Sequence, residues 1–188
     1  TFSSRGLGDV YKRQALLTTV LIGCNEASNK KSTMPEEKKQ ADKPQETPID
    51  TTPKVTGIGG IFFFSENPEE TRKWYAENLG LAVNQWGSSF EFRNAHRPDE
   101  INYLQWSPFK QGSEYFAPSK KEFMINYRVQ NIEGLVKKLE ANGVTVVDSI
   151  ETYDYGKFVH IMDAEGNKIE LWEPVDSVFT AMGGETTK

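Results

Sequence analysis

The stretch GIGGIFFFSENPEETRKWYAENLGL, residues 57–81, joins an apolar run to a capped helix. Asn67 followed by Pro68 predicts a helix start, because asparagine caps free backbone amides and proline fits the first helical position. Gly80 predicts the helix end. We therefore expect an apolar strand followed by a helix over roughly 68–79.

The same order recurs about 63 residues later. FMINYRV has the pattern of a strand, Asn131 caps IEGLVKKLEAN, and Gly143 ends that helix, which we expect over 132–142. Three strand candidates follow each helix: LAVNQW, SSFEFRN and INYLQW after the first, and VTVVDSI, KFVHIMD and NKIELWE after the second. The repeat predicts an α+β fold of two βαβββ modules, about 55–106 and 122–175.

Two such modules, closed by DAEGNKIELWEP (163–174), resemble the vicinal oxygen chelate (VOC) superfamily. That superfamily groups glyoxalases, bleomycin-resistance proteins and extradiol dioxygenases. The resemblance covers about residues 55–175 and implies a cleft between curled sheets, with a divalent metal held by side chains from both modules. We expect a glyoxalase-like domain over 54–176 and a C-terminal tail over 177–188.

The resemblance maps four metal-ligand positions onto this chain. The glutamate of the last strand matches Glu170, whereas the other positions fall on Gly60, about Gln105, and Met124. Hard divalent metals prefer several carboxylate or imidazole ligands, and glycine has no side-chain donor. We therefore expect the usual metal site to be lost, with Glu170 the one matched ligand and no resident cofactor.

Glu170 and His160 are the candidate catalytic residues. In NKIELW, strand alternation sends Ile169 and Leu171 toward the helices and Glu170 toward the cleft. In the hairpin that we infer, His160 lies directly across from Glu170. A carboxylate beside an imidazole favours its charged form, which is common in acid/base catalysis and equally common as a structural pair. We expect Glu170 to bond either His160 or Gln105.

Alternation fills the rest of the cleft face with aromatic and polar side chains. Such a pocket is typical of small-molecule sites, although the same rings could simply fill the space between the sheets. The segment SPFKQGSEYFAPSKK (107–121) either covers one end of the cleft or packs as an ordinary crossover. The candidate ligand-binding residues are Phe62, Phe64, Tyr103, Gln105, Met124, Asn126, Arg128 and Trp172.

Three functions remain open. The first is a metal-independent protein that binds a small-molecule ligand in the aromatic cleft, as the bleomycin-resistance type of the family does. The second is an enzyme of glyoxalase type, a lyase (lactoylglutathione lyase-like), isomerase or dioxygenase, which would use Glu170 and a divalent metal. The third is a structural envelope protein with a vestigial cleft.

Charge and pattern also bear on partners. The formal net charge of −5 and the lack of a basic, aromatic-interleaved stripe argue against a nucleic-acid partner. The sequence leaves open whether the modules pair within one chain or exchange between two chains. We favour a homodimer.

The N-terminal residues suggest a lipid anchor. ALLTTVLIGC (15–24) has the pattern of a signal-peptide core, too short to span a bilayer, and LIGC resembles the bacterial lipobox. The resemblance implies that Cys24 carries the lipid of an envelope lipoprotein; a buried helix with an inert cysteine is the alternative. Residues 25–53 are expected to form a disordered tether reaching roughly 30 Å. DVYKRQ resembles a translated sequencing adaptor, so residues 1–14 are set aside.

Overall fold

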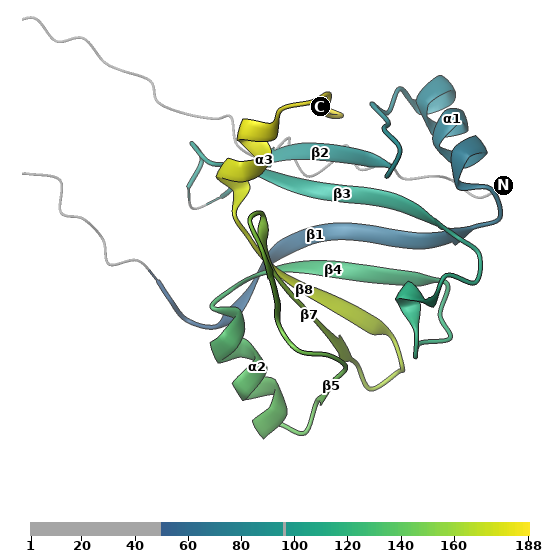
Figure 1. Ribbon diagram of the computed structural model, residues 1–188. Helices are drawn as coiled ribbons and strands as arrows, with labels where there is room; N and C mark the ends of the chain where they lie inside the picture. The colour runs from purple at the N-terminus through teal and green to yellow at the C-terminus, as the bar shows by residue number, and fades with distance from the viewer. Residues whose placement is uncertain (1–49, 96) are drawn as a thin grey trace, which may run out of the picture. The chain divides into compact units, whose positions relative to one another are not determined.

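A computed structural model describes residues 50–95 and 97–188, and the N-terminal segments named above lie outside this range. The described chain forms one eight-stranded sheet in the order β2-β3-β1-β4-β8-β7-β5, with β6 paired to β7 (Figure 1). In chain order the elements are β1 (Lys54–Ser65), α1 (Pro68–Leu79), β2 (Ser88–Arg93), β3 (Ile101–Lys110), η2 (Glu114–Phe116), β4 (Phe123–Gln130), α2 (Ile132–Ala141), β5 (Thr145–Val146), β6 (Glu151–Tyr153), β7 (Gly156–Met162), β8 (Lys168–Pro174) and α3 (Asp176–Met182).

The sheet consists of two halves with the same connectivity. In the first half β1 runs parallel to β3, and β3 pairs antiparallel with β2. In the second half β4 runs parallel to β8, and β8 pairs antiparallel with β7. Strands β1 and β4 join the halves antiparallel within the one chain. The predicted repeat and the α+β fold class are confirmed.

Both predicted helices form where their capping residues stand. The side-chain oxygen of Asn67 accepts from the amide of Glu70, and Gly80 ends α1 in the left-handed region with φ 71°. Asn131 caps α2 in the same way, accepting from the amide of Gly134 at 3.0 Å. In the described part of the chain no helix is long and apolar enough to cross a bilayer.

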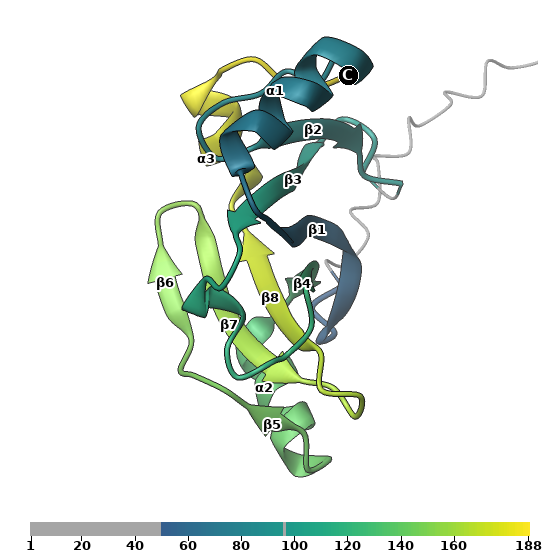
Figure 2. The ribbon, with the colours of Figure 1, turned by 90° about the vertical axis from the view of Figure 1, so that its right-hand side faces the viewer.

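The two helices are packed unequally. α1 lies at the β2–β3 end of the sheet and carries no buried residue, whereas α2 lies at the opposite end over a well-buried core (Figure 2). The second half therefore holds most of the apolar burial on the helix side of the sheet. Its core residues are Val129, Ile132, Leu135, Val159, Ile161 and Leu171.

The prediction of a strand at LAVNQW is wrong, because this segment makes only an isolated bridge at Val83. The side-chain oxygen of Asn84 accepts from the amides of Trp86 and Gly87 and closes a turn there. A Cβ at Gly87 would lie 1.9 Å from the carbonyl oxygen of Trp106, so the chain passes directly against β3. Of the strand predicted at VTVVDSI, only the two residues of β5 are in strand conformation.

The C-terminal segment, expected as a tail, returns to the sheet as α3. Phe179 of α3 packs against Tyr103 and Trp172, with ring centroids 5.6 and 5.4 Å apart. The amide of Thr187 then donates to the carbonyl oxygen of Ser89 on the edge strand β2 at 2.8 Å. These contacts make α3 part of the wall of the cleft.

Candidate ligand-binding site

Six residues form one row across the sheet, one from each of β2, β3, β1, β4, β8 and β7. Strand register pairs each with the next, and the β1–β4 pair joins the two halves. Partners in register project to the same side of a sheet, so the six share one face. In strand order the row is Ser89, Gln105, Gly60, Asn126, Glu170 and His160.

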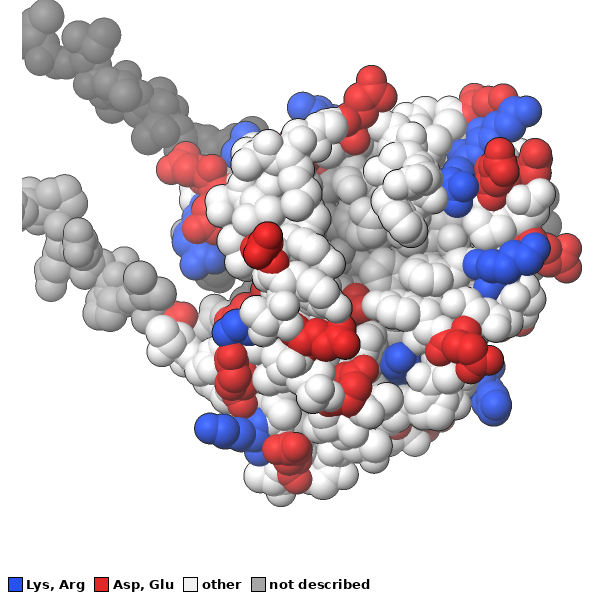
Figure 3. Space-filling view, in the orientation of Figure 1, with Lys and Arg blue, Asp and Glu red and all other residues white. Residues whose placement is uncertain are grey.

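A cavity of about 170 Å³ opens on this face. Figure 3 shows the molecule hollowed near the centre of this view, with mostly uncharged residues around the hollow. A larger hollow of about 700 Å³ lies beside α3, but no residue of the row lines it. The lining of the smaller cavity comes from both halves and α3: polar Ser89, Gln105, Asn126 and Glu170, aromatic Phe62, Tyr103, Tyr155, Phe158, Trp172 and Phe179, and Gly59.

Glu170 is the charged residue of the cavity lining, and it is only 3% exposed. Its Oε1 accepts from Asn126 Nδ2 at 2.5 Å. Its Oε2 accepts from the Tyr115 hydroxyl and lies 3.1 Å from His160 Nε2. A buried carboxylate needs such donors to offset its lost hydration. The predictions that Glu170 faces the cleft and bonds His160 are confirmed.

Gln105 is not a partner of Glu170, although the sequence left that open. Its Oε1 accepts from Ser89 Oγ at 2.8 Å, and its Nε2 donates to Ser107 Oγ at 3.0 Å. The amide is thereby satisfied by neutral hydroxyl groups within its own half of the sheet.

His160 connects Glu170 to the molecular surface. Its Nδ1 lies 2.6 Å from an oxygen of Asp148, and that carboxylate side chain is 41% exposed. Burial lowers the pKa of His160, but hydrogen bonding to Glu170, the charge of Glu170 and hydrogen bonding to Asp148 together raise it above 6.5. In its charged form the imidazole donates from both nitrogens, one to each carboxylate.

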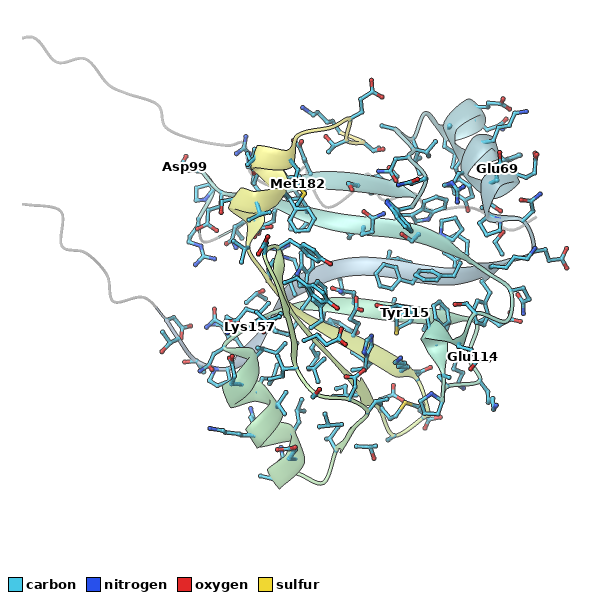
Figure 4. The ribbon with its side chains drawn as sticks, viewed as in Figure 1. Glu69, Asp99, Glu114, Tyr115, Lys157 and Met182 are labelled. Carbon is cyan, nitrogen blue, oxygen red and sulfur yellow. The ribbon has the colours of Figure 1, made fainter. Side chains whose placement is uncertain are left out.

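The connection between the halves covers one end of the site. Tyr115 comes from η2 (Figure 4), with its ring parallel to Phe109 at 5.2 Å and edge-on to His160 at 5.5 Å. Lys168 Nζ donates to the carbonyl oxygen of Tyr115 at 2.7 Å. Burial and then the charge of Glu170 raise the pKa of Tyr115, which keeps the hydroxyl protonated as a donor. Tyr115 of this segment therefore lies over Glu170 and His160 at one end of the row, although no residue of 107–121 lines the cavity.

Three of the eight predicted ligand-binding residues lie outside the cavity lining. Phe64 stacks on Phe116 at 4.3 Å, and Met124 is fully buried in the same cluster. Arg128 lies over the Trp172 ring at 5.2 Å and forms an ion pair with Asp176 of α3. The five predicted residues that do line the cavity are Phe62, Tyr103, Gln105, Asn126 and Trp172.

Several site residues escaped the sequence prediction. Strand alternation could have identified Phe158, because it precedes His160 by two positions and so lies on the same face of the strand. Tyr155 in a turn and Phe179 in α3 reach the cavity only through tertiary packing. The same holds for Tyr115 and Asp148, which contact the row without belonging to it.

The row does not fit a divalent-metal site. Gly60 offers no side-chain donor, and a Cβ there would lie 2.7 Å from the Phe62 ring. The residue that faces Gly60 is Asn126, so assigning the second module's position to Met124 was wrong by two residues. Glu170 is already bonded to three side chains, and residues 50–95 and 97–188 contain no group of three or more His, Cys, Asp or Glu that could hold a metal. A hard cation wants several anionic ligands, which this row does not supply.

Comparisons with solved structures show the fold alone. A methylmalonyl-CoA epimerase variant from Streptomyces coelicolor is 12% identical with a TM-score of 0.50, covering 65% of this chain and 99% of that chain. The epimerase from Mycobacterium tuberculosis is 18% identical, TM-score 0.46, over 67% and 93% of the two chains. The 2,3-dioxygenase LapB from Pseudomonas sp. KL28 is 19% identical, TM-score 0.40, over 64% and 41%.

The curated proteins contain no match to this sequence. The family model described as "Glyoxalase/Bleomycin resistance protein/Dioxygenase superfamily" matches residues 57–171, which is more than half of the chain and includes both halves of the sheet. The chain therefore belongs to the glyoxalase/bleomycin resistance protein/dioxygenase superfamily.

Proposed function

We propose that this protein binds a small molecule in the cavity without a metal ion. The observation that carries the proposal is the lining itself, in which six aromatic side chains surround one buried carboxylate. Small-molecule sites are concave, mostly apolar and equipped with a few polar groups that fix orientation. Aromatic rings supply rigid contact area for a planar ligand at little entropic cost. The donor set of the row gives the metal-dependent alternative no support.

Two substitutions within α3 test this proposal. Phe179 lines the cavity, whereas Met182 of the same helix is 64% exposed and does not line it (Figure 4). A fragment library of planar compounds is screened by ligand-observed NMR on the full chain. Phe179→Ala should weaken the hits about tenfold, because a ring wall is lost, and Met182→Ala should leave them unchanged. Equal effects of both substitutions, or no hits, would contradict the proposal.

Proton transfer is a second candidate, supported by the chain of groups from Glu170 through His160 to Asp148. Glu170 lines the cavity, His160 Nε2 lies 3.1 Å from its Oε2, and Asp148 is exposed enough to exchange protons with water. A buried carboxylate with a route to solvent can accept and return a proton. Deuterium uptake from D₂O into a bound C–H acid, lost in Glu170→Gln, would support this candidate; no uptake in any hit would count against it.

We also propose that Cys24 anchors the protein to an envelope membrane through a lipid. The support is the apolar run that ends in LIGC and the polar stretch that follows it. A lipid on Cys24 would leave the cleft domain outside the membrane on a tether. Mass spectrometry of protein expressed from the complete gene should find the lipid on Cys24. Recovery of an unmodified Cys24 would reject the anchor.

A homodimer is a further proposal. Ile58, Ile61 and Phe123 are 37%, 40% and 45% exposed, and they lie on β1 and β4 on the face opposite the cavity. Exposed apolar groups clustered on one face are typical of an interface. Light scattering on eluted protein should give twice the mass of the chain, and Ile61→Glu should halve it. A monomer at high concentration would reject the dimer.

A further inference from the structure

We propose that the ligand of this cavity is a compact planar molecule carrying an NH₂-type donor, such as an amine, amidine or primary amide, and not a carboxylate or phosphate. The inference rests on the proposed function, because it names the class of ligand for the same cavity. It follows from which hydrogen-bonding positions of the lining are filled and which are vacant.

The side-chain donors of the row are already engaged within the protein. Ser89 Oγ donates to Gln105 Oε1 at 2.8 Å, and Gln105 Nε2 donates to Ser107 Oγ at 3.0 Å. Asn126 Nδ2 donates to Glu170 Oε1. A carboxylate or phosphate brings only acceptors, and the donor left to it in the row is the second N–H of the Asn126 amide, beside the negative charge of Glu170.

The donors on the aromatic wall are largely engaged as well. The Tyr103 hydroxyl bonds Thr180 Oγ1 at 3.1 Å, and because Thr180 donates to a backbone carbonyl, Tyr103 is the donor in this pair. Trp172 Nε1 donates to the carbonyl oxygen of Tyr155 at 3.4 Å. The Tyr155 hydroxyl can donate or accept, so it does not favour an acceptor ligand over a donor ligand.

Two acceptor positions are vacant, and they lie next to each other. An ionised carboxylate offers about four lone-pair positions, and three side chains bond Glu170, with Asn126 alone on Oε1. A position on Oε1 is therefore open. Asn126 is 2% exposed, and its Oδ1 is buried without a hydrogen-bond partner among the described residues.

The orientation of the Asn126 amide follows from its neighbour. Turning the amide over would place its oxygen against Glu170 Oε1, which repels it, so the NH₂ group must face Glu170 and Oδ1 must face away. A Cβ at position 59 would lie 2.1 Å from Oδ1, so only glycine lets this oxygen keep its position beside the cavity. The two vacant acceptors belong to side chains that are joined by a hydrogen bond, and both side chains line the cavity.

Charge favours the same class of ligand. Glu170 is the charged lining residue, and the two basic side chains that contact lining residues are engaged elsewhere: Arg128 with Asp176, and His160 with Asp148 and Glu170. Aromatic rings attract a cation through their electron-rich faces. An amidinium therefore gains from both the carboxylate and the rings, whereas an anion gains from neither.

Three probes of nearly equal shape test the inference. Benzamidine, benzamide and benzoate are titrated into the full chain by calorimetry at one pH and salt concentration. We expect the dissociation constant of benzamidine to be at least about tenfold lower than that of benzoate. A tenfold ratio is what one additional charge-assisted hydrogen bond to the ligand would give. Glu170→Gln should abolish the preference for benzamidine over benzamide, and Glu165→Gln, on an exposed turn, should retain it.

The outcomes separate this inference from the proposed function. Benzoate could bind as tightly as benzamidine, with both weakened by Phe179→Ala. That result would overturn the inference that the ligand carries an NH₂-type donor, but it would still support binding in the cavity. No binding by any of the three probes would overturn both. The probe comparison on the unchanged chain decides the question even if Glu170→Gln fails to fold.

Discussion

The two halves of the sheet share their connectivity but not their chemistry. At equivalent places in the row, the first half has Gln105 beside Ser89, whereas the second half has Glu170 beside His160. The first pair is neutral and satisfied by local hydroxyl groups. The second pair contains a buried carboxylate whose partners come from β4, η2 and β7. One half therefore carries neutral polar groups in the row, and the other carries a buried charged network.

This difference has an energetic consequence. Gln105 depends on groups within its own half, so replacing Gln105 should disturb the packing of that half only. Glu170 depends on donors from three separate elements, because a buried charge needs more compensation than a buried amide. The charged half should therefore be coupled to the packing of the η2 connection, and the neutral half should not.

The largest expected effect comes from replacing the residues at the two ends of the row, His160 and Ser89. His160→Ala leaves Glu170 and Asp148 without the imidazolium that joins them, and we expect the free energy of unfolding to fall by about 3 kcal/mol. Ser89→Ala removes one neutral hydrogen bond and should cost about 1 kcal/mol. Urea denaturation of the full chain gives both values. Equal losses would show that the halves do not differ as described.

A smaller effect is expected from two tyrosine–glutamate hydrogen bonds. Tyr115→Phe removes a donor from the buried Glu170 and should destabilise the fold by about 2 kcal/mol. Tyr153→Phe removes a similar bond to the exposed Glu151 and should cost less than about 0.5 kcal/mol. The thermal midpoints of the two variants, measured side by side, check this. A loss in Tyr153→Phe as large as in Tyr115→Phe would mean that burial does not set the cost.

The pH dependence of stability should show the smallest effect. Since folding raises the pKa of His160, its stabilising contribution is complete below about pH 6.5 and is lost as the pH rises through the folded-state pKa. The unchanged chain should therefore lose stability across that interval relative to His160→Gln. Denaturation midpoints of both proteins from pH 5.5 to 9 measure the difference. A difference that stays constant with pH would mean that His160 does not titrate as described.

The sequence was sufficient for elements defined by local signals. The caps at Asn67 and Asn131 located both helices. Strand alternation placed Glu170 on the cavity face, where it is paired with His160 of the neighbouring strand. The hairpin between those strands also closes as expected, because Asp163 accepts from the amide of Asn167 at 2.8 Å. These features depend on neighbours within about ten residues, which a pattern can reveal.

The sequence failed where the repeat is not regular. A constant offset from Gly60 leads to Met124, but the row contains Asn126, because Gly60 lies seven positions before the cap Asn67, whereas Asn126 lies only five positions before the cap Asn131. Tyr115 and Phe179 were missed for a related reason, because no local pattern reports which loop or helix folds over a cavity.

The most direct test of the central claim, that this cleft operates without a metal, is metal analysis of the purified full chain. Mass spectrometry of the metal content is followed by titration with zinc, nickel, manganese and iron(II), using Glu170→Gln and the exposed Glu165→Gln as a matched pair. We expect far less than one equivalent of any metal and no change in thermal midpoint on chelation. Retention of about one equivalent that is lost in Glu170→Gln and kept in Glu165→Gln would contradict it.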